Sequence, residues 1–502
     1  MVIAIDADLL ALQEMRTAVQ IAKEAQLAYM SFTQEQVDRI VKAVADAAYE
    51  QSARLGKMAV EETGMGVAAH KTIKNEVGSR DVYESIKDLK TVGVVGEDKV
   101  KKVVEIAAPF GVVAAIIPTT NPTSTAFFKT LIALKTRNSI VVSPHPYAIQ
   151  CTNEALKVCD DAAVSAGAPK GLIQCLTMAS MDATQQLMKH PDVNLILATG
   201  GSALVKAAYS SGKPAYGVGP GNVPVYIERS AKIEKAVKNI IDSKSFDYGT
   251  ICATEQAIVV DRNILELVNR ELKKNGAYIL SDEEKLIMEK VVSPVPGKVN
   301  PKIVGKSPQA IAKLAGITLP EGIRVIVGME TKVGKEIPFS LEKLSPVFAM
   351  YVASDLNHAK ELCLSLLNLG GRGHSLSIHT ETDAIAREFA MDMPVSRILV
   401  NTMSSVGAVG GTTGLMPSMT LGCGTFGGNI TSDNVTAKHL LNIKRMAYGI
   451  KEVQLPKNTA VSSEDVTEQV VSQVLKSMSS SDNVNPEMVK DLVNEIVKQL
   501  SK

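Results

Sequence analysis

The chain has 502 residues and a formal net charge of +1, with acidic and basic residues interspersed. Its length predicts two or three domains, and its charge balance argues against nucleic acid as a partner. No apolar run approaches the roughly 20 residues that cross a bilayer, and the first residues lack the basic segment and cleavage site of a signal peptide. The six cysteines show no zinc-type spacing, so we expect free thiols in a reducing cytosol and no metal site.

The first half of the chain changes its apolar period near residue 111. Residues 7–62 predict two amphipathic helices, and the alternating residues 99–107 predict a strand. Apolar strands then alternate with helices, which predicts a parallel, doubly wound sheet. The expected strands are 111–118, 139–142, 172–176 and 195–198, and the expected helices are 122–135, 147–166 and 183–189.

A second alternating series follows residue 229 and starts with a helix-like run over residues 230–245. Together, the two series predict an α/β fold with two doubly wound domains. A glycine-rich segment, residues 407–429, precedes a last expected strand within residues 430–450. The other expected strands are 255–260, 324–328, 347–352, 374–379 and 397–400.

The last part of the chain predicts two short amphipathic helices, which Ser479–Asp482 separates. A helix of about 15 residues is marginal alone in water. It therefore needs a partner, which is the chain's own core, a neighbouring subunit or a protein that recognises a targeting peptide. The second helix, capped at Asn485, carries Val489, Leu492, Val493, Ile496, Val497 and Leu500 on one face.

Cys252 is the first candidate for chemistry. It stands on a turn of small and flexible residues, between the helix-like run 230–245 and the apolar run 257–260. A thiol in such a place can attack a carbonyl carbon. Free cysteines are more often small buried apolar residues, so Cys252 alone leaves both interpretations open.

Three further segments border expected strands. Residues 118–124 follow a buried strand, where ligands bind in open α/β sheets, and Asn121 there can direct an amide N–H at an oxyanion or simply form a turn. Residues 199–202 join a strand to a helix, as a phosphate-binding turn or a plain turn with a serine cap. The full dinucleotide fingerprint is absent. Glu342 precedes a strand and either binds a ribose hydroxyl or stays solvated.

Together, these segments resemble the aldehyde dehydrogenase superfamily in order and spacing over residues 1–450, and most closely its CoA-acylating branch. In that pattern Cys252 is similar to the nucleophile, Asn121 to the oxyanion asparagine and Glu342 to the nicotinamide-ribose carboxylate. The resemblance implies two Rossmann-like domains, a small β oligomerisation extension and a helical tail. It also implies cofactor contacts from Thr119, Thr120, Ser143, Pro144, His145, Thr199, Gly200, Gly201, Gly219 and His374.

Two departures from the pattern sharpen the expected reaction. Residues 217–222 stand where hydrolytic members carry a general-base glutamate, and nothing in this segment can deprotonate water. CoA is already a thiol and needs no such base. Ser143, Pro144 and His145 stand where hydrolytic members place a lysine on the adenosine ribose. NAD is the expected cofactor, ahead of NADP.

The resemblance thus implies reversible, NAD-dependent oxidation of propanal or acetaldehyde to acyl-CoA through a Cys252 thioester. A hydrolytic or semialdehyde dehydrogenase and a non-catalytic shell-interaction protein remain the alternatives. The resemblance also implies a homodimer or homotetramer formed through residues 96–107 and 433–450. The expected location is the cytoplasm or a bacterial microcompartment lumen, with shell proteins bound through residues 485–502.

The same resemblance gives the expected domains. Residues 1–228 hold the N-terminal helices and the dinucleotide-binding domain, and residues 229–430 form the catalytic domain. Residues 431–450 form an oligomerisation segment, and residues 451–502 form a linker and an amphipathic tail.

Overall fold

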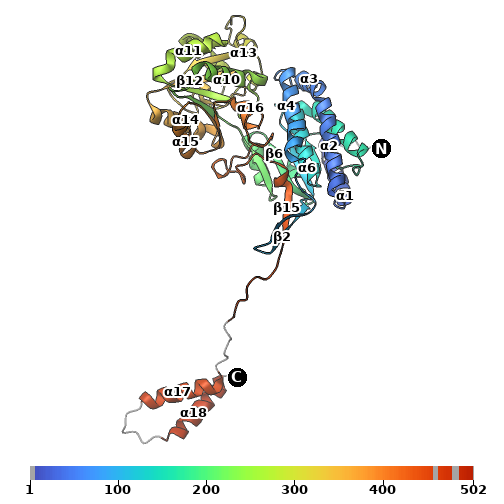
Figure 1. Ribbon diagram of the computed structural model, residues 1–502, viewed down its shortest axis with the longest axis vertical. Coiled ribbons are helices and arrows are strands. Elements are labelled where there is room, and N and C mark those ends of the chain that lie inside the picture. Colours follow the sequence, from blue (N-terminus) through green and yellow to red (C-terminus); the bar gives the residue numbers. More distant parts are fainter. Residues whose placement is uncertain (1–5, 456–461, 478–484, 501–502) are drawn as a thin grey trace. The chain divides into compact units, whose positions relative to one another are not determined.

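The computed structural model describes residues 6–455, 462–477 and 485–500. A large unit comprises residues 6–97 and 104–446, and a small unit comprises residues 98–103 and the described residues from 447 onward. The large unit is built around two parallel sheets with helices on both faces, which confirms the predicted α/β class (Figure 1). The predicted separator Ser479–Asp482 lies outside the described residues.

The first sheet has five parallel strands in the order β5-β4-β3-β6-β7. Successive residues of the central strand enter opposite cores, because side chains alternate along a strand: Val113 packs with one helical layer and Val112 with the other. The strands are β3 (Val112–Ile116), β4 (Ser139–Ser143), β5 (Ile173–Cys175), β6 (Val193–Thr199) and β7 (Ala215–Val218).

Helices cover both faces of this sheet. One core holds residues of α2 (Gln34–Glu50), α3 (Ser52–Thr63), α6 (Pro122–Lys135) and α7 (Ile149–Ser165). The other holds residues of α1 (Ala7–Tyr29), α8 (Met181–Lys189) and α9 (Ser202–Tyr209). The strand order reverses between β3 and β6, and such a reversal opens a crevice at the carboxyl ends of the strands.

The second sheet has seven parallel strands in the order β10-β11-β12-β9-β8-β13-β14. Its strand β8 precedes residue 229, so this sheet begins earlier in the chain than the second predicted series. The strands are β8 (Val223–Ile227), β9 (Glu255–Asp261), β10 (Ala277–Ile279), β11 (Val325–Met329), β12 (Val347–Ala353), β13 (Gly373–His379) and β14 (Val395–Val400).

Helices α10 (Ile233–Ser245) and α11 (Leu265–Lys274) share a core with one face of this sheet. The opposite core contains α12 (Asp282–Val292), α13 (Pro308–Leu314), α14 (Leu356–Gly370) and α15 (Asp383–Asp392). The shorter helices include α4 (Ala68–Glu76), the π-helix η1 (Val77–Asp81), α5 (Val82–Ile86), the 3-10 helix η3 (Phe246–Gly249) and α16 (Ser404–Ala408).

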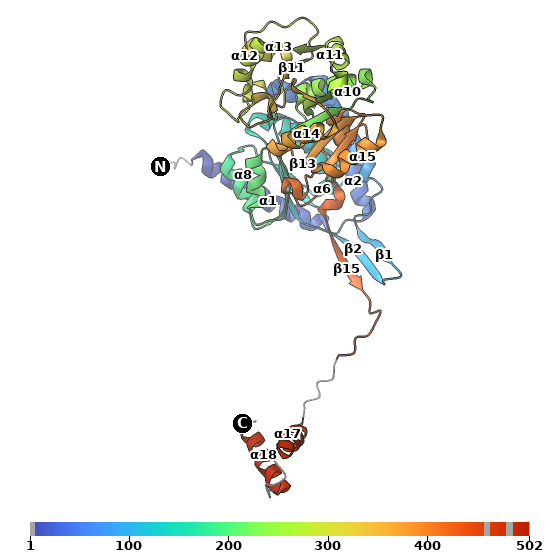
Figure 2. The same cartoon turned by 90° about the vertical axis from the view of Figure 1, so that its left-hand side faces the viewer.

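A third, small sheet joins β1 (Gly93–Asp98), β2 (Val103–Pro109) and β15 (Leu441–Ala447), which Figure 2 shows side by side. The predicted strand 99–107 is wrong over its first four residues. These form the turn between β1 and β2, because the Asp98 carboxylate accepts hydrogen bonds from the N–H groups of Val100 and Lys101. Strand β15 is mostly exposed.

The N-terminal helices also differ from expectation. Residues 7–62, predicted as two helices, belong to α1, α2 and α3. The extra break falls at Gln51, where the backbone angles of φ −92° and ψ 6° leave the helical region. Amphipathic spacing continues through such a break, so the periodicity alone does not reveal it.

The small unit contains α17 (Ser463–Ser477) and α18 (Pro486–Leu500), which pack against each other. The N–H of Glu487 donates to the Asn485 side chain at 3.0 Å, as a helix cap requires. Val493 is buried in this pair, whereas Met488, Leu492, Ile496 and Leu500 stay exposed. One apolar stripe of α18 is therefore uncovered within the described residues.

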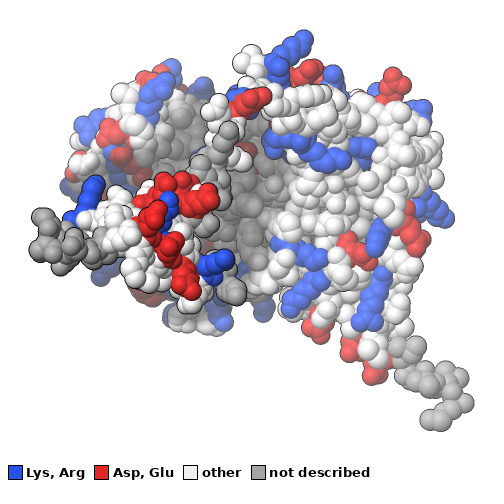
Figure 3. Space-filling view, turned by 90° about the horizontal axis from the view of Figure 1, so that it is seen from below, with Lys and Arg blue, Asp and Glu red and all other residues white. Residues whose placement is uncertain are grey.

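Both signs of charge occur on the face drawn in Figure 3, in keeping with the net charge of +1. None of the helices described combines the length and the apolar character that crossing a bilayer requires.

Candidate active site

A cavity of about 550 Å³ lies where the two parallel sheets meet. Residues that follow β3, β4 and β6 line one part of it, and residues that precede β8, β9 and β12 line another. Residues at the start of α8, together with Val409, Met419 and Leu421, complete the lining. Every predicted site residue except His374 borders this cavity. The first sheet thus contributes the carboxyl ends of its strands, and the second contributes the amino ends.

Cys252 is half-buried and stands on the turn before β9. The three residues Asp247, Tyr248 and Gly249 have φ values of +50°, +51° and +74°, so the chain is left-handed just before the turn. Burial raises the pKa of the Cys252 thiol to about 12, and the nearby Glu342 carboxylate adds to the shift. The thiol is therefore protonated in this form of the protein.

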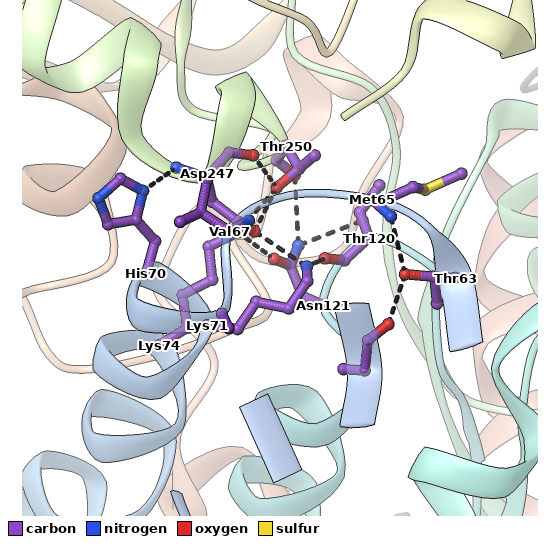
Figure 4. A network of polar contacts seen from close by, with 12 residues as sticks. Thr63, Met65, Val67, His70, Lys71, Lys74, Thr120, Asn121, Asp247 and Thr250 are labelled. Atoms are coloured by element: carbon purple, nitrogen blue, oxygen red, sulfur yellow. Dashed lines mark hydrogen bonds and ion pairs between the residues drawn. The ribbon is translucent and has the colours of Figure 1, made fainter. Parts of the chain in front are cut away.

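A buried ion network lies beside this turn (Figure 4). The Asp247 carboxylate pairs with Lys71 at 3.0 Å and with Lys74, and it accepts the Val67 N–H at 2.7 Å. Burial alone raises the pKa of Asp247, but the two ammonium groups outweigh it and lower the pKa to about 2. Asp247 is thus charged throughout the physiological range. Sequence reasoning missed all three of these charged residues.

Asn121 is attached to the same network. Its Oδ1 accepts a hydrogen bond from Lys74 Nζ at 2.6 Å. Its Nδ2 lies 3.2 Å from Thr120 Oγ1 and 3.4 Å from the carbonyl oxygen of Thr250, two residues before Cys252. The structure therefore brings the amide N–H of Asn121 to the loop that carries the candidate nucleophile.

Glu342 lies across the cavity and is half-buried rather than solvated. Its carboxylate accepts the Gly221 N–H at 2.9 Å, and burial raises its pKa to about 7. Gly221 has no room for a side chain: a Cβ there would lie 2.3 Å from the carbonyl oxygen of Cys252 and 2.9 Å from His374 Cγ. Gly221, in the segment 217–222, therefore lies directly against the Cys252 turn.

His374 lies behind Gly221 and does not border the cavity. The ring is buried, its Nδ1 lies 3.0 Å from Ser375 Oγ, and its Nε2 has no hydrogen-bond partner in the described part of the chain. Burial, followed by the Arg397 guanidinium, lowers the pKa of His374 to about 3. The imidazole is therefore neutral.

The first sheet offers a place for an anionic cofactor. Helix α9 begins at the cavity with Gly201 as its N-cap, and no side chain caps it, so of the two alternatives for this turn the one with a serine cap is wrong. A Cβ on Gly201 or Gly219 would meet nothing within 4 Å, so both positions are open. Uncapped N–H groups at a helix start suit a phosphate. These residues fit a dinucleotide. Among the described residues, no cluster of three metal-ligating side chains occurs.

Relatives share this architecture. The bifunctional aldehyde-alcohol dehydrogenase AdhE of Escherichia coli K12 is 46% identical over 453 residues, which cover 89% of this chain and 51% of that protein. The chain spans about half the length of the curated relatives it matches first. An acetylating aldehyde dehydrogenase from Geobacillus thermoglucosidasius is 54% identical, with a TM-score of 0.89 over 90% of this chain and 100% of that one.

Two more distant structures are propionaldehyde dehydrogenases. One comes from the fucose utilisation bacterial microcompartment of Clostridium phytofermentans, with 29% identity and a TM-score of 0.79 over 87% of this chain and 97% of that one. The other, from Rhodopseudomonas palustris, contains bound CoA and an acylated cysteine, with 30% identity and a TM-score of 0.78 over 86% of this chain and 97% of that one. The aldehyde dehydrogenase family model matches residues 5–428, and the chain belongs to this family.

Proposed function

We propose that the protein catalyses the reversible, NAD-dependent and CoA-acylating oxidation of a short-chain aldehyde, with propanal or acetaldehyde as substrate. The segment 217–222 supports this reaction most strongly, because it contains no carboxylate and its Gly221 packs against the Cys252 turn. Among the described residues that border the cavity, the one acid is Glu342. The acetylating relative and the CoA-bound, acylated relative support the same reaction.

The first step uses Cys252. Its sulfur bonds to the aldehyde carbon while the carbonyl π electrons move to oxygen, and the thiol proton passes to solvent water. The Nδ2–H of Asn121 and the N–H of Cys252 stabilise the resulting oxyanion. Cys252 is protonated at rest, so its proton must be released as the sulfur attacks.

Glycines 200, 201 and 219 and the start of α9 would hold the dinucleotide phosphates, and Glu342 would bind the nicotinamide ribose. When bound, the nicotinamide supplies the hydride acceptor. What remains on the protein is an acyl thioester of Cys252. Because residues 217–222 offer no base for water, this thioester persists until the CoA sulfur attacks its carbonyl carbon. The Cys252 sulfur then leaves and takes up the proton that the CoA thiol gives up, which restores the Cys252 thiol.

Omission of CoA tests this reaction. With propanal and NAD, we expect steady NADH formation when CoA is added, with propionyl-CoA as product, and no steady turnover without it. Cys252→Ala should abolish both. NADH formation at full rate without CoA would instead show that the enzyme hydrolyses the thioester, with Glu342 as the base that deprotonates water. Acetaldehyde and butanal, run beside propanal, define the chain length, and NADP, run beside NAD, defines the cofactor.

We also propose that α17 and α18 target the enzyme to the shell of a bacterial microcompartment. The uncovered apolar stripe of α18, with Leu492 and Ile496 at its centre, supports this role. So does the microcompartment origin of the Clostridium relative. Deleting residues 455–502 should leave kcat unchanged and abolish co-localisation with shell proteins. Loss of folding on deletion would assign the tail to the enzyme's own assembly.

The same proposal includes a homodimer or homotetramer. The exposed strand β15, in the segment 433–450, carries exposed Met446, and Tyr448 and Ile450 follow it. An exposed strand with apolar neighbours suits pairing with another subunit. Light scattering of the full chain and of a Met446→Lys, Ile450→Lys variant measures the molar mass of the assembly. The variant should have a lower molar mass than the wild type.

A further inference from the structure

Asn121 receives a charge-assisted hydrogen bond from a lysine that the proposed reaction does not use. Lys74 Nζ lies 2.6 Å from Asn121 Oδ1 and 2.9 Å from Thr250 Oγ1, and it pairs with the Asp247 carboxylate. An ammonium has three donors and no acceptor. These three partners match its three hydrogens, inside a side chain that is 3% exposed.

This contact determines which way the Asn121 amide faces. Because an ammonium can only donate, the atom beside Lys74 is the amide oxygen, and the amide nitrogen points the other way, toward Thr250 O. An amide turned over would present its oxygen to the oxyanion and repel it. The bond also draws electron density from the amide, which strengthens its N–H as a donor.

Lys71, one turn earlier on α4, has a different second partner. It pairs with the same Asp247 carboxylate at 3.0 Å, but its other bond, at 2.9 Å, goes to the backbone oxygen of Thr120. Lys71 thus holds the chain, whereas Lys74 holds the Asn121 side chain. Burial lowers the pKa of Lys74 to about 8, with Asp247 opposing the shift, so the ammonium is the main form at pH 7.

We infer that Lys74 is a positioning residue, which orients and polarises the Asn121 amide for oxyanion stabilisation. This inference rests on the proposed thioester chemistry of Cys252. It does not depend on whether CoA or water receives the acyl group, since both routes pass through an oxyanion beside Asn121.

A double-mutant cycle tests the inference in the full-length enzyme. Asn121→Ala should lower kcat about 10²- to 10³-fold, as loss of an oxyanion donor does. Lys74→Met should lower kcat about 10- to 100-fold, with KM changed less than about twofold. In the Asn121→Ala background, Lys74→Met should change kcat less than about threefold, because the amide on which it acts is gone. Equal losses in both backgrounds would overturn the inference.

Lys71→Met is the matched control, since it removes the other ammonium on Asp247 and leaves the Lys74–Asn121 bond in place. Its effect on kcat should be the same with and without Asn121. Lys74→Gln, whose neutral amide can still donate to Asn121, should recover part of the activity that Lys74→Met loses. No recovery, where both variants fold, would contradict an orienting role.

Two further measurements distinguish positioning of Asn121 from activation of the thiol and from a role in folding. The Cys252 thiolate acts on Lys74 less than Asp247 and Lys71 do. The pH dependence of Cys252 alkylation by iodoacetamide should therefore shift little in Lys74→Met, and a large shift would place the effect of Lys74 on the thiol. Thermal unfolding of Lys74→Met and Lys74→Gln should show folded proteins, since Asp247 keeps Lys71. Failure of both to fold would assign Lys74 to the core and overturn the inference. If the wild type turns over without CoA, the acylating function is contradicted. The double-mutant cycle would still test the role of Lys74, because hydrolysis also passes through the oxyanion.

Discussion

The two sides of the Cys252 turn each carry a carboxylate, and their surroundings shift the two pKa values in opposite directions. Asp247 is buried between two ammonium groups, which lower its pKa to about 2 despite the burial. Glu342 is half-buried and accepts one backbone N–H, and burial raises its pKa to about 7. The two pKa values differ because the partners differ: two ammonium groups neutralise the charge of Asp247, whereas Glu342 accepts a hydrogen bond from a single N–H.

This contrast separates anchoring from ligand binding. A carboxylate that stays charged and fully paired holds Lys74, Asn121 and the left-handed segment before Cys252 in place. A carboxylate near its pKa, at the cavity wall, retains capacity for a ribose hydroxyl. Removing the Asp247 carboxylate should therefore lower the stability of the fold, and removing the Glu342 carboxylate should lower the affinity for the cofactor.

Asp247→Asn gives the largest expected effect. Asparagine tolerates the left-handed φ of +50°, so the substitution isolates the charge. It leaves two buried lysines without a counter-ion, which should lower the free energy of unfolding by about 3–5 kcal/mol. Urea unfolding measures this. Asp383→Asn, which removes an exposed pair with Arg387, is the control and should cost less than about 1 kcal/mol. If the two variants lost the same small amount of unfolding free energy, Asp247 would not hold this part of the fold in place.

Glu342→Gln should act on cofactor binding instead. Loss of a charge-assisted hydrogen bond to a ribose hydroxyl costs about 1.5–3 kcal/mol, which corresponds to a KM for NAD about 10- to 100-fold higher. The unfolding midpoint at pH 7 should fall little. Steady-state kinetics at saturating aldehyde and CoA measure the KM. A collapse of stability with an unchanged KM would make Glu342 a second anchor.

The two carboxylates should also respond to pH in opposite ways. The folded pKa of Glu342, about 7, exceeds its ordinary 4.5, so its contribution to stability is present in acid and is lost as pH rises through 7. The folded pKa of Asp247 lies below its ordinary 3.8, so its contribution is present above 3.8 and is lost as pH falls toward 2.

The Glu342→Gln variant isolates the pH dependence of stability that Glu342 causes, which is the smallest of the three expected effects. Between pH 5 and pH 8, the wild type should lose about 2 kcal/mol of unfolding free energy relative to the variant, a value reduced for the partial exposure of Glu342. Urea unfolding of both proteins across this range is the measurement. Parallel pH curves would show that Glu342 titrates as a solvated carboxylate.

Sequence reasoning identified the parts of the cavity that border strands. Cys252, Asn121 and Glu342 each stand where an apolar strand begins or ends, and such strands show in the sequence as continuous apolar runs. The parallel topology then brings these ends together. The same reasoning placed α6 and β9 to within one residue of their observed bounds.

The ion network escaped prediction for a physical reason. Lys71 and Lys74 lie three residues apart on a helix, a spacing that solvent-exposed lysines share. Their burial depends on Asp247, more than 170 residues later in the chain. Nothing local marks the pair. The position of His374 behind Gly221 likewise follows from the pairing of β13 with β8, which no local pattern determines.

Mass spectrometry of the Cys252 peptide tests the acylating function most directly. The enzyme is mixed with propanal and NAD, quenched, digested and compared with a sample to which CoA is added before quenching. Without CoA, one equivalent of NADH should form, and Cys252 should carry a propionyl group that persists for many turnover times. Added CoA should remove the group and yield an equal amount of propionyl-CoA. An unmodified Cys252 with continued release of propionate in the absence of CoA would contradict the proposed function.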